Sequence, residues 1–344
     1  MNNLETHYGE IAPGKFYLKA DLDTIETYLR DHFFLDPTEA VIHAEKPGEG
    51  NMNYVLRVRT NIRSFIVKQA RPWVEKYPQI PAPVERNAVE ARYFRLVEKS
   101  PALKSFSPQL LYEDVANNML ILSDLGQAND YSSIYREGNL EEAELKAIVT
   151  YLSALHRIHE PSYPRNGSMR TLNHEHIFQY PFDPENGLDL DQIQPGLRDL
   201  AGAVQKNQPL KKRIEALGKI YLSQGDVLIH GDFYPGSWLQ SSGGFKVIDP
   251  EFSFNGIAEF DVAVLVAHLM LAGQPDAHLN YILHHCQEQN QLEVSLIAGF
   301  CGTEILRRIL GVAQLPLRWN LNELQQLVDQ AVNCIMTGKI ASTC

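Results

Sequence analysis

The order of apolar and polar residues in the first third of the chain indicates a small mixed domain. Residues 21–34 show helical spacing after an acidic start. Three short strands are predicted next, in AVIHAEK, NYVLRVRT and SFIVKQA. Helical spacing returns in VERNAVEARYFRLVEK, and two more strands, QLLYEDV and NMLILSDL, meet at a hairpin-like turn near Asn117. Residues 1–125 therefore read as a leading helix, three strands, a helix and two strands.

The pattern changes after Leu125. Residues 140–159 form a strongly amphipathic helix, residues 160–195 are rich in Pro, Asn and Asp and predict a long, partly ordered loop, and a helix is expected around 196–217. Two short strands follow in DVLIHGDF and GFKVIDPEF, and nearly all of the remainder, from about Glu259 to Ile340, is predicted to be helical. The sequence thus favours an α+β chain with a small β-rich N-terminal lobe over 1–125 and a larger, mainly helical C-terminal lobe over 126–344.

Composition narrows the class of protein. The chain has 344 residues, of which 44% are hydrophobic and 21% charged, so it is long enough for two domains and a large core. Lys and Arg number 31 against 42 Asp and Glu, which gives a net charge of −11. Nucleic-acid phosphates and anionic lipids repel such a chain, so neither nucleic acid nor a membrane is an expected partner. The net charge does not exclude a local basic pocket that binds a small anion.

The cysteines and the N-terminus bear on the cellular compartment. No two of the four cysteines, Cys286, Cys301, Cys334 and Cys344, are closer than ten positions, so CxxC spacing is absent from the sequence. Scattered thiols are typical of a reducing compartment. No basic segment followed by an apolar run opens the chain, and the longest strongly apolar stretch, residues 262–273, is too short for a membrane span. We therefore expect a cytoplasmic protein, with a homodimer left open.

The most informative chemistry lies in VLIHGDFYPGSWL (227–239) and FKVIDPEF (245–252). One strand leads into Asp232, and a second leads into Asp249, seventeen residues later, with Glu251 two positions further on. Phosphoryl transfer to a hydroxyl needs one carboxylate to orient the hydroxyl and accept its proton, and another to hold the metal that bridges the nucleotide phosphates. Acidic residues at the ends of two adjacent strands can supply both roles.

These motifs, together with GEGNMNYVLRV (48–58), IVKQARPWV (66–74), VIDPEFSFNGIAEFD (247–261) and EILRRILGVAQL (304–315), resemble those of the aminoglycoside-phosphotransferase-like kinases, which are small-molecule relatives of the protein kinases. Within that family they are most similar to the methylthioribose kinases. The resemblance covers roughly residues 40–335 and is weakest across 115–225. It implies a bilobal protein-kinase-like fold, ATP and Mg²⁺ as cofactors, and transfer of the γ-phosphoryl group to a small-molecule hydroxyl acceptor.

The resemblance also assigns roles in the C-terminal lobe. It implies Asp232 as the catalytic base and Asp249 as a Mg²⁺ ligand. Glu251 is either a second metal ligand or part of a salt bridge. Ser237 stands where many relatives have a metal-binding Asn, and it either acts on the metal through a water or caps the next element. His230 is expected to orient the loop by hydrogen bonding.

Asp261 lies at the start of the helix that follows the catalytic segment. It is expected to tie the catalytic loop to that helix; the alternative is a plain acidic residue in the first helical turn.

In the N-terminal lobe, Lys68 ends a strand and is expected to contact the nucleotide phosphates, with Glu90 on the following helix as its ion-pair partner. Backbone N–H groups of the turn that contains Gly48, Gly50 and Asn51 are expected to cover phosphates, although the turn read alone is an ordinary hairpin. The segment from Leu122 through Ser123 to Leu125 is expected to be a hinge whose backbone bonds adenine.

Arg307 and Arg308 lie in an otherwise apolar helical stretch, CGTEILRRILGVA. Spacing alone allows a surface pair with Glu304, four residues before Arg308. The resemblance favours a substrate-side or transition-state role, in which two cations offset the charge of the transferred phosphoryl group.

Three functions compete. The first is a kinase that phosphorylates 5-methylthioribose or a similar sugar. The second is an aminoglycoside- or choline-type kinase, which the two arginines disfavour because its acceptor is cationic. The third is a nucleotide-binding pseudokinase, which Lys68, Asp232 and Asp249 disfavour because all three are present.

Overall fold

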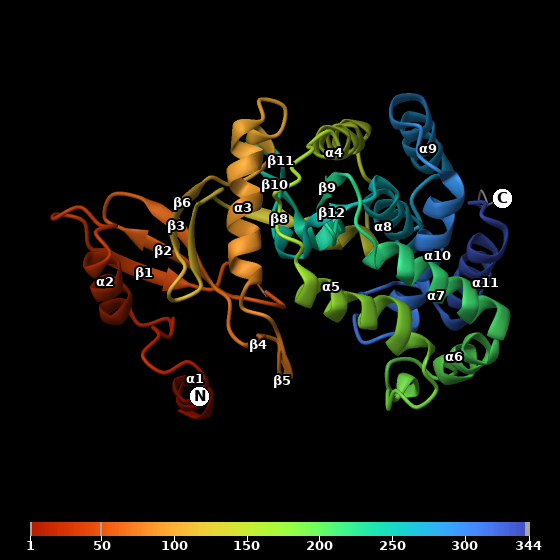
Figure 1. Ribbon diagram of the computed structural model, residues 1–344, viewed down its shortest axis with the longest axis horizontal. Helices are drawn as coiled ribbons and strands as arrows, with labels where there is room; N and C mark the ends of the chain where they lie inside the picture. Colours follow the sequence, from red (N-terminus) through yellow and green to blue (C-terminus); the bar gives the residue numbers. More distant parts are fainter. Residues whose placement is uncertain (1, 49, 341–344) are drawn as a thin grey trace. The chain divides into compact units, whose positions relative to one another are not determined.

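The computed structural model describes residues 2–48 and 50–340, and the chain divides into two compact units, one ending at Gln127 and the other beginning at Ala128 (Figure 1). The roles expected for the two lobes remain predictions. Three of the four cysteines are buried, and the fourth, Cys344, lies outside the described residues. Across the described ranges, the structure contains no helix that is both long enough and apolar enough to span a membrane.

The first unit is built on a five-stranded antiparallel sheet with the strand order β1-β2-β3-β7-β6. The predicted strands and helices are all found. They are β1 (Val41–Glu45), β2 (Tyr54–Thr60), β3 (Ser64–Gln69), β6 (Leu110–Asp114), β7 (Met119–Ser123), α2 (Leu22–Asp31) and α3 (Arg86–Lys99). The elements that the sequence pattern did not indicate are α1 (Asn2–Ile11), the hairpin of β4 (Trp73–Val74) and β5 (Tyr77–Pro81), and the 3₁₀ turn η1 (Lys104–Phe106).

Alternation along the strands places one face of this sheet in the core. Leu56 and Val58 on β2 are fully buried, and Arg57 between them is only partly so, as a period of two requires. Helix α2 packs against β1, and its N-terminus is capped by Asp21, whose carboxylate accepts the Thr24 N–H at 2.8 Å. Helix α3 packs against β6 and β7.

The second unit is mainly helical. Its strands form two small antiparallel sheets, one of β11 (Gly244–Val247), β10 (Trp238–Ser241) and β8 (Ala128–Asp130), and one of β12 (Phe254–Gly256) and β9 (Val227–Ile229). Its helices are α4 (Glu142–Leu155), α5 (Gly167–His174), α6 (Leu197–Lys206), α7 (Gln208–Leu222), α8 (Ala258–Leu271), α9 (Asp276–Asn290), α10 (Val294–Leu310) and α11 (Leu321–Thr337). Six short helical turns complete it, η2 (Tyr131–Tyr135), η3 (Glu175–Gln179), η4 (Tyr180–Phe182), η5 (Leu190–Gln192), η6 (Pro235–Ser237) and η7 (Pro250–Phe252).

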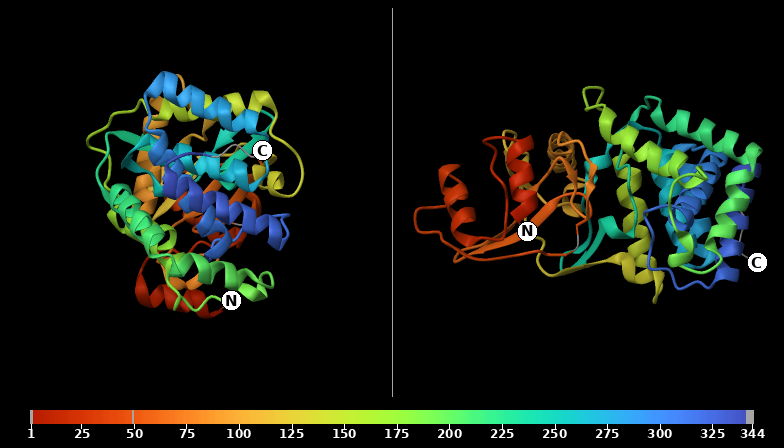
Figure 2. Two further views of the ribbon diagram at one scale, coloured as in Figure 1. Left: turned by 90° about the vertical axis from the view of Figure 1, so that its right-hand side faces the viewer. Right: turned by 90° about the horizontal axis from the view of Figure 1, so that it is seen from below.

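Two of these helices form the centre of the second unit. Helix α8 is buried around its whole circumference from Phe260 onward, which matches its apolar sequence on every face. Helix α10 packs against α8 on one side and α11 on another, and α11 in turn contacts α7 and α6 (Figures 1 and 2). Gly302 permits this approach, because a Cβ there would lie 2.4 Å from the carbonyl oxygen of Ala331 on α11.

Two expectations about the middle of the chain need correction. The loop expected over 160–195 is interrupted by helical structure from Gly167 to Phe182: α5 continues into the π-helical turn η3, where Met169, Ile177 and Phe178 bury their side chains. The single helix expected around 196–217 is two helices, α6 and α7. They separate at Asn207, whose side chain caps α7 by accepting the Leu210 N–H at 3.1 Å.

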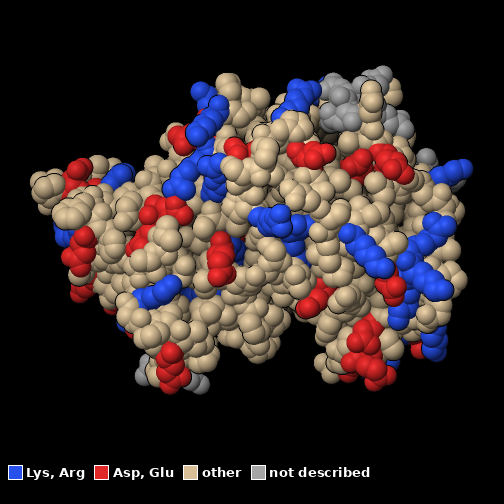
Figure 3. All heavy atoms as spheres, viewed as in Figure 1, with Lys and Arg blue, Asp and Glu red and all other residues tan. Residues whose placement is uncertain are grey.

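Charged side chains of both signs are interspersed on the face seen in Figure 3. Acidic side chains on that face are therefore interrupted by basic ones rather than gathered into one acidic area.

Candidate active site

The segment that carries Asp232 leaves β9 and is held by one buried carboxylate. Asp261, in the first turn of α8, accepts the backbone N–H of His230 at 2.7 Å and that of Gly231 at 2.9 Å. Its Oδ2 atom also lies 3.1 Å from Nε2 of His156. The expectation that Asp261 ties this loop to the following helix is thereby confirmed, and the loop is fixed by backbone contacts immediately before Asp232.

Gly231 brings the two acidic segments together. Its φ angle of 82° lies in the left-handed region, and a Cβ atom there would lie 2.3 Å from the carbonyl oxygen of Phe252. Nε2 of His230 lies 3.0 Å from the carbonyl oxygen of Ile248, so the imidazole joins the same two segments, as expected. The His-Gly-Asp sequence therefore needs glycine in the middle for steric reasons.

Ser237 supports Asp232 through its backbone. The Ser237 hydroxyl donates to the carbonyl oxygen of Asp232 at 3.0 Å, and the Ser237 carbonyl accepts the N–H of Ile248 at 3.0 Å. The side chain is buried. Ser237 thus links the loop to Ile248, between the end of β11 and Asp249, and its role toward a metal remains a prediction.

Asp249 adopts a left-handed backbone with a φ angle of 59° at the end of β11. Asp tolerates this conformation better than most residues, and the following Pro250 disfavours the right-handed helical alternative. Glu251 is buried in the next turn. Among the described residues, no three His, Cys, Asp or Glu side chains gather into a metal cluster. Mg²⁺ needs fewer protein ligands than that, because it commonly takes one or two carboxylates together with phosphates and waters.

Arg307 and Arg308 of α10 both reach Asp232. Their Nη2 atoms lie 3.5 and 3.4 Å from the Asp232 Oδ1 atom. Both guanidiniums also bind Glu304 of the same helix, with Nε–O distances of 2.6 Å for Arg307 and 2.7 Å for Arg308. The contact with Glu304 is present, but the alternative of a surface pair is wrong, because all three side chains are buried. Arg307 and Arg308 therefore share two carboxylates, that of Glu304 and that of Asp232.

Charges in this cluster balance, two carboxylates against two guanidiniums. Burial raises the pKa of Asp232, although Arg308 and Arg307 partly oppose the shift. Burial alone would raise the pKa of Glu304 as well, but Arg307 and Arg308 hold it well below its usual range. The arginine pair is therefore anchored on an ionised Glu304 and turned toward a carboxylate that is more basic than usual.

Two side chains near this cluster carry no role in the sequence prediction. Tyr234 lies under Arg308, with 4.7 Å between the guanidinium carbon and the ring centroid. His176, on the π-helical turn η3, is half-buried, and its pKa is lowered by burial and by the positive charge of Arg307. A π-helical turn is a frequent mark of a functional site and is the only such signal for His176, but it is visible in the fold and not in the sequence.

In the first unit, Lys68 and Glu90 form the ion pair that the sequence predicts. The Lys68 Nζ atom lies 2.6 Å from Oε1 of Glu90, and both side chains are buried. Arg86, one turn before Glu90 on α3, donates from its Nε to the side-chain oxygen of Asn53 at 2.9 Å. The helix is thus fastened to the strand residue Lys68 and to the turn before β2. Contact with phosphates remains a prediction for Lys68.

The predicted phosphate-covering turn and hinge are both braced. Gly48, Gly50 and Asn51 lie in the exposed turn between β1 and β2, where the Asn51 carbonyl accepts the N–H of Lys76 at 3.0 Å. Glu49, in the same turn, lies outside the described residues.

At the hinge, the Ser123 hydroxyl accepts the N–H of Gln109 at 2.9 Å. Arg57 donates to Oδ2 of Asp124 at 3.0 Å and to the carbonyl of Gly126 at 2.6 Å, on either side of Leu125.

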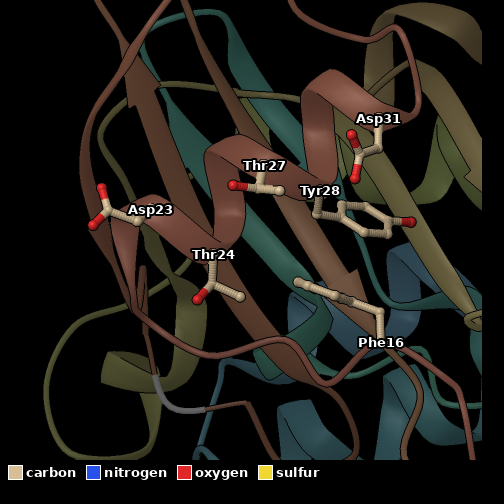
Figure 4. Close-up of a pocket in the computed structure, with 6 residues that line it drawn as sticks. All are labelled: Phe16, Asp23, Thr24, Thr27, Tyr28 and Asp31. Carbon is tan, nitrogen blue, oxygen red and sulfur yellow. The ribbon is translucent and has the colours of Figure 1, made fainter.

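Buried tryptophans and surface hollows are further features of the two units. Trp73 and Trp238 are buried in the cores of their units. A hollow of about 390 Å³ lies over α2, where Asp23, Thr24, Thr27 and Asp31 share one face of the helix beside the stacked rings of Phe16 and Tyr28 (Figure 4). A second hollow, of about 450 Å³, lies between η3 and α7 and is lined in part by His174, Phe178 and Lys219.

The sequence was compared with protein families and with known proteins. The model of the phosphotransferase enzyme family (APH) matches residues 43–293. A methylthioribose kinase of Exiguobacterium sibiricum is 28% identical over 248 residues, which cover 68% of this chain and 62% of that protein. A methylthioribose kinase of Bacillus cereus is 22% identical over 360 residues, which cover 90% of this chain and 88% of that protein.

Solved structures agree on the fold. The choline kinase LicA from Streptococcus pneumoniae superposes with a TM-score of 0.50 at 14% identity, covering 92% of this chain and 98% of that one. A spectinomycin phosphotransferase, solved with ADP and spectinomycin, superposes with a TM-score of 0.51 at 13% identity, covering 94% and 99%. The predicted α+β, kinase-like fold is confirmed.

Proposed function

The chain belongs to the phosphotransferase enzyme family and is a small-molecule kinase, and from this premise we propose that it transfers the γ-phosphoryl group of ATP to a hydroxyl of 5-methylthioribose or a similar sugar. The methylthioribose kinases among its relatives support the choice of acceptor. The observation that carries the proposal is the arrangement at Asp232, where one carboxylate of raised pKa faces two guanidiniums.

Asp232 acts on the acceptor hydroxyl. Its carboxylate orients the O–H group and takes the proton as the oxygen bonds to phosphorus and the bond from phosphorus to ADP breaks. A raised pKa makes the carboxylate a better proton acceptor, provided that it is ionised. Arg307 and Arg308 stabilise the negative charge on the transferred phosphoryl oxygens, because their guanidiniums already lie at the Asp232 oxygen where the reaction occurs.

ATP and Mg²⁺ are the cofactors of this proposal. The oxygen donors Asp249 and Glu251 are of the type that Mg²⁺ prefers, and they lie two positions apart in the segment that follows β11. When bound, the ion neutralises phosphate charge. In the first unit, Lys68, held by Glu90, contacts phosphates, the glycine-containing turn covers them, and the backbone around Ser123 and Leu125 bonds adenine.

The neutral sugar is preferred over an amine for an electrostatic reason. A cationic acceptor at Asp232 is repelled by Arg307 and Arg308, whereas the hydroxyls of a sugar can donate to the carboxylate without that cost. Of the sugar's hydroxyls, the anomeric one is the proposed site of phosphorylation.

The test compares acceptors side by side. ADP release with Mg·ATP is measured for 5-methylthioribose, a kanamycin-like aminoglycoside and choline, with the wild type and with Arg307→Met and Arg308→Met. We expect 5-methylthioribose to be the best acceptor. Each substitution should lower kcat/KM by a factor that corresponds to about 2–4 kcal/mol of lost transition-state stabilisation. A clear preference for an amine-bearing acceptor, or indifference to the loss of both arginines, overturns the proposal.

A further inference from the structure

Behind the arginine pair lies a buried row of hydrogen-bonding side chains that the proposed chemistry does not use. Tyr135 of η2 has its hydroxyl 2.5 Å from Nδ1 of His268 on α8. Nε2 of the same imidazole lies 3.0 Å from Oε1 of Glu304 on α10. None of the three residues is more than 1% exposed. The row thus begins at a phenol and ends at the carboxylate that binds Arg307 and Arg308.

The contacts fix where the protons lie. Burial lowers the pKa of His268 to about 4, so the imidazole is neutral at physiological pH. The charged groups that face it are Glu304, Arg307 and Arg308 of α10, and the ring of Tyr234 lies 5.3 Å away on the catalytic loop. A neutral imidazole bonds a carboxylate only through an N–H group, so Nε2 carries the hydrogen. Nδ1 is then an acceptor, and the Tyr135 hydroxyl donates to it.

The effect of this row falls on the orientation of the Glu304 carboxylate. Oε1 accepts from His268 at 3.0 Å, from Nε of Arg308 at 2.7 Å and from Nη2 of Arg307 at 3.0 Å. Oε2 accepts from Nε of Arg307 at 2.6 Å. Glu304 therefore holds Arg308 through Nε and Arg307 through Nε and Nη2, and the Nη2 atom of each guanidinium also reaches Asp232. The two arginines already balance the charges of Asp232 and Glu304, so a neutral histidine adds direction rather than charge.

We propose that Tyr135, His268 and Glu304 are positioning residues that aim the guanidiniums of Arg307 and Arg308 at Asp232. The proposal rests on the proposed function for its consequence in catalysis. Its structural content, a carboxylate oriented from behind by a tautomer-locked histidine, depends only on the contacts within the second unit.

The first experiment measures turnover with the best acceptor. Tyr135→Phe and His268→Leu each remove one link, and we expect kcat to fall about tenfold to a hundredfold while KM for ATP stays unchanged, because a buried polar group loses its partner. His268→Gln keeps an N–H donor near the Nε2 position and is expected to restore most of the activity. Tyr131→Phe is the matched control, since Tyr131 lies in the same turn η2 and bonds Glu144 at 3.0 Å instead.

The second experiment needs no substrate. The Nε–Hε signals of Arg307 and Arg308 in the ¹⁵N-labelled protein are expected to exchange slowly with water in the wild type and in Tyr131→Phe, and faster in His268→Leu and Tyr135→Phe. If the wild type phosphorylates none of the acceptors but this pattern holds, the proposed function fails and the positioning role stands. If the arginine signals and kcat of His268→Leu and Tyr135→Phe match those of the wild type, or if Tyr131→Phe changes them equally, the positioning role is overturned.

Discussion

Each unit buries ion-paired side chains, but the two arrangements are built in different ways. Lys68 and Glu90 come from a neighbouring strand and helix, 22 positions apart, and meet in one contact of 2.6 Å. The cluster around Asp232 draws on the catalytic loop, η2, α8 and α10, and Tyr135 and His268 alone are 133 positions apart. A substitution in an isolated pair affects one contact and can be compensated by changing the partner. A substitution in a connected row of groups affects several contacts at once, so its effects on stability are not additive.

The largest expected effect comes from the reactive end of the cluster. Asp232→Asn should lower kcat by about 10²–10⁴-fold, because an amide cannot accept the hydroxyl proton. Nucleotide affinity, measured by calorimetric titration, should stay near that of the wild type, since the groups proposed to bind ATP lie elsewhere. Asp199→Asn, at an exposed position of α6, is the control. Turnover within a few-fold of the wild type would remove Asp232 from the mechanism.

The stability contributed by the Lys68–Glu90 pair should depend on whether the buried charges balance. Lys68→Met leaves the buried Glu90 carboxylate without this cation and should cost about 3–5 kcal/mol in the free energy of unfolding. The double variant with Glu90→Gln should recover most of that stability, measured by urea denaturation, but not the activity. Equal instability of the single and double variants would show that the pair is not the source of the loss.

The free energy of unfolding should depend on pH through His268. The pKa of His268 falls from its ordinary value of 6.5 to about 4 in the fold, so the unfolded chain binds an extra proton between these values. The stability contributed by the neutral imidazole is complete above pH 6.5 and is lost as the pH falls towards 4, by about 3 kcal/mol. His268→Gln lacks this dependence, so its free energy of unfolding should fall less steeply than that of the wild type between pH 7 and 4. Parallel curves would place the titration elsewhere.

The smallest effect concerns the backbone beneath both acidic segments. Gly231→Ala forces a Cβ into the carbonyl of Phe252 at a left-handed φ and should cost about 1–3 kcal/mol of stability. Gly202→Ala is the matched control, because a Cβ there meets no atom within 4 Å and α6 gains a better helix former. Thermal unfolding of both variants is the measurement. A lower melting temperature for Gly231→Ala but not for Gly202→Ala supports a steric need for glycine at position 231, and equal melting temperatures contradict it.

Prediction from the sequence succeeded where a signal is local. Alternation gave the strands of the first unit, and the place of Asp261 at the start of the helix after the Asp232 segment indicated the tie between loop and helix. It failed between residues 160 and 195, where Pro, Asn and Asp suggested a loop. Short helices there are stabilised by tertiary burial of Ile177 and Phe178 rather than by helix propensity.

The buried row was missed for a different reason. His268 sits in an apolar run and Glu304 in an apolar helix, and each is a titratable residue at a position that the pattern marks as core. That mismatch was the available signal, but it does not say which residues meet. Their partners come from elements far apart in the chain, so only the packing of α8 on α10 reveals them.

Burial of α10 from Ile297 to Leu310 also bears on how its two arginines can move. Amide hydrogens of a helix enclosed by α8 and α11 exchange with solvent only when the surrounding core opens, so those of α10 should report the global free energy of the second unit. Arg307 and Arg308 are part of this enclosed stretch of α10. We therefore expect Arg307 and Arg308 to stay beside Asp232 for as long as this core stays closed.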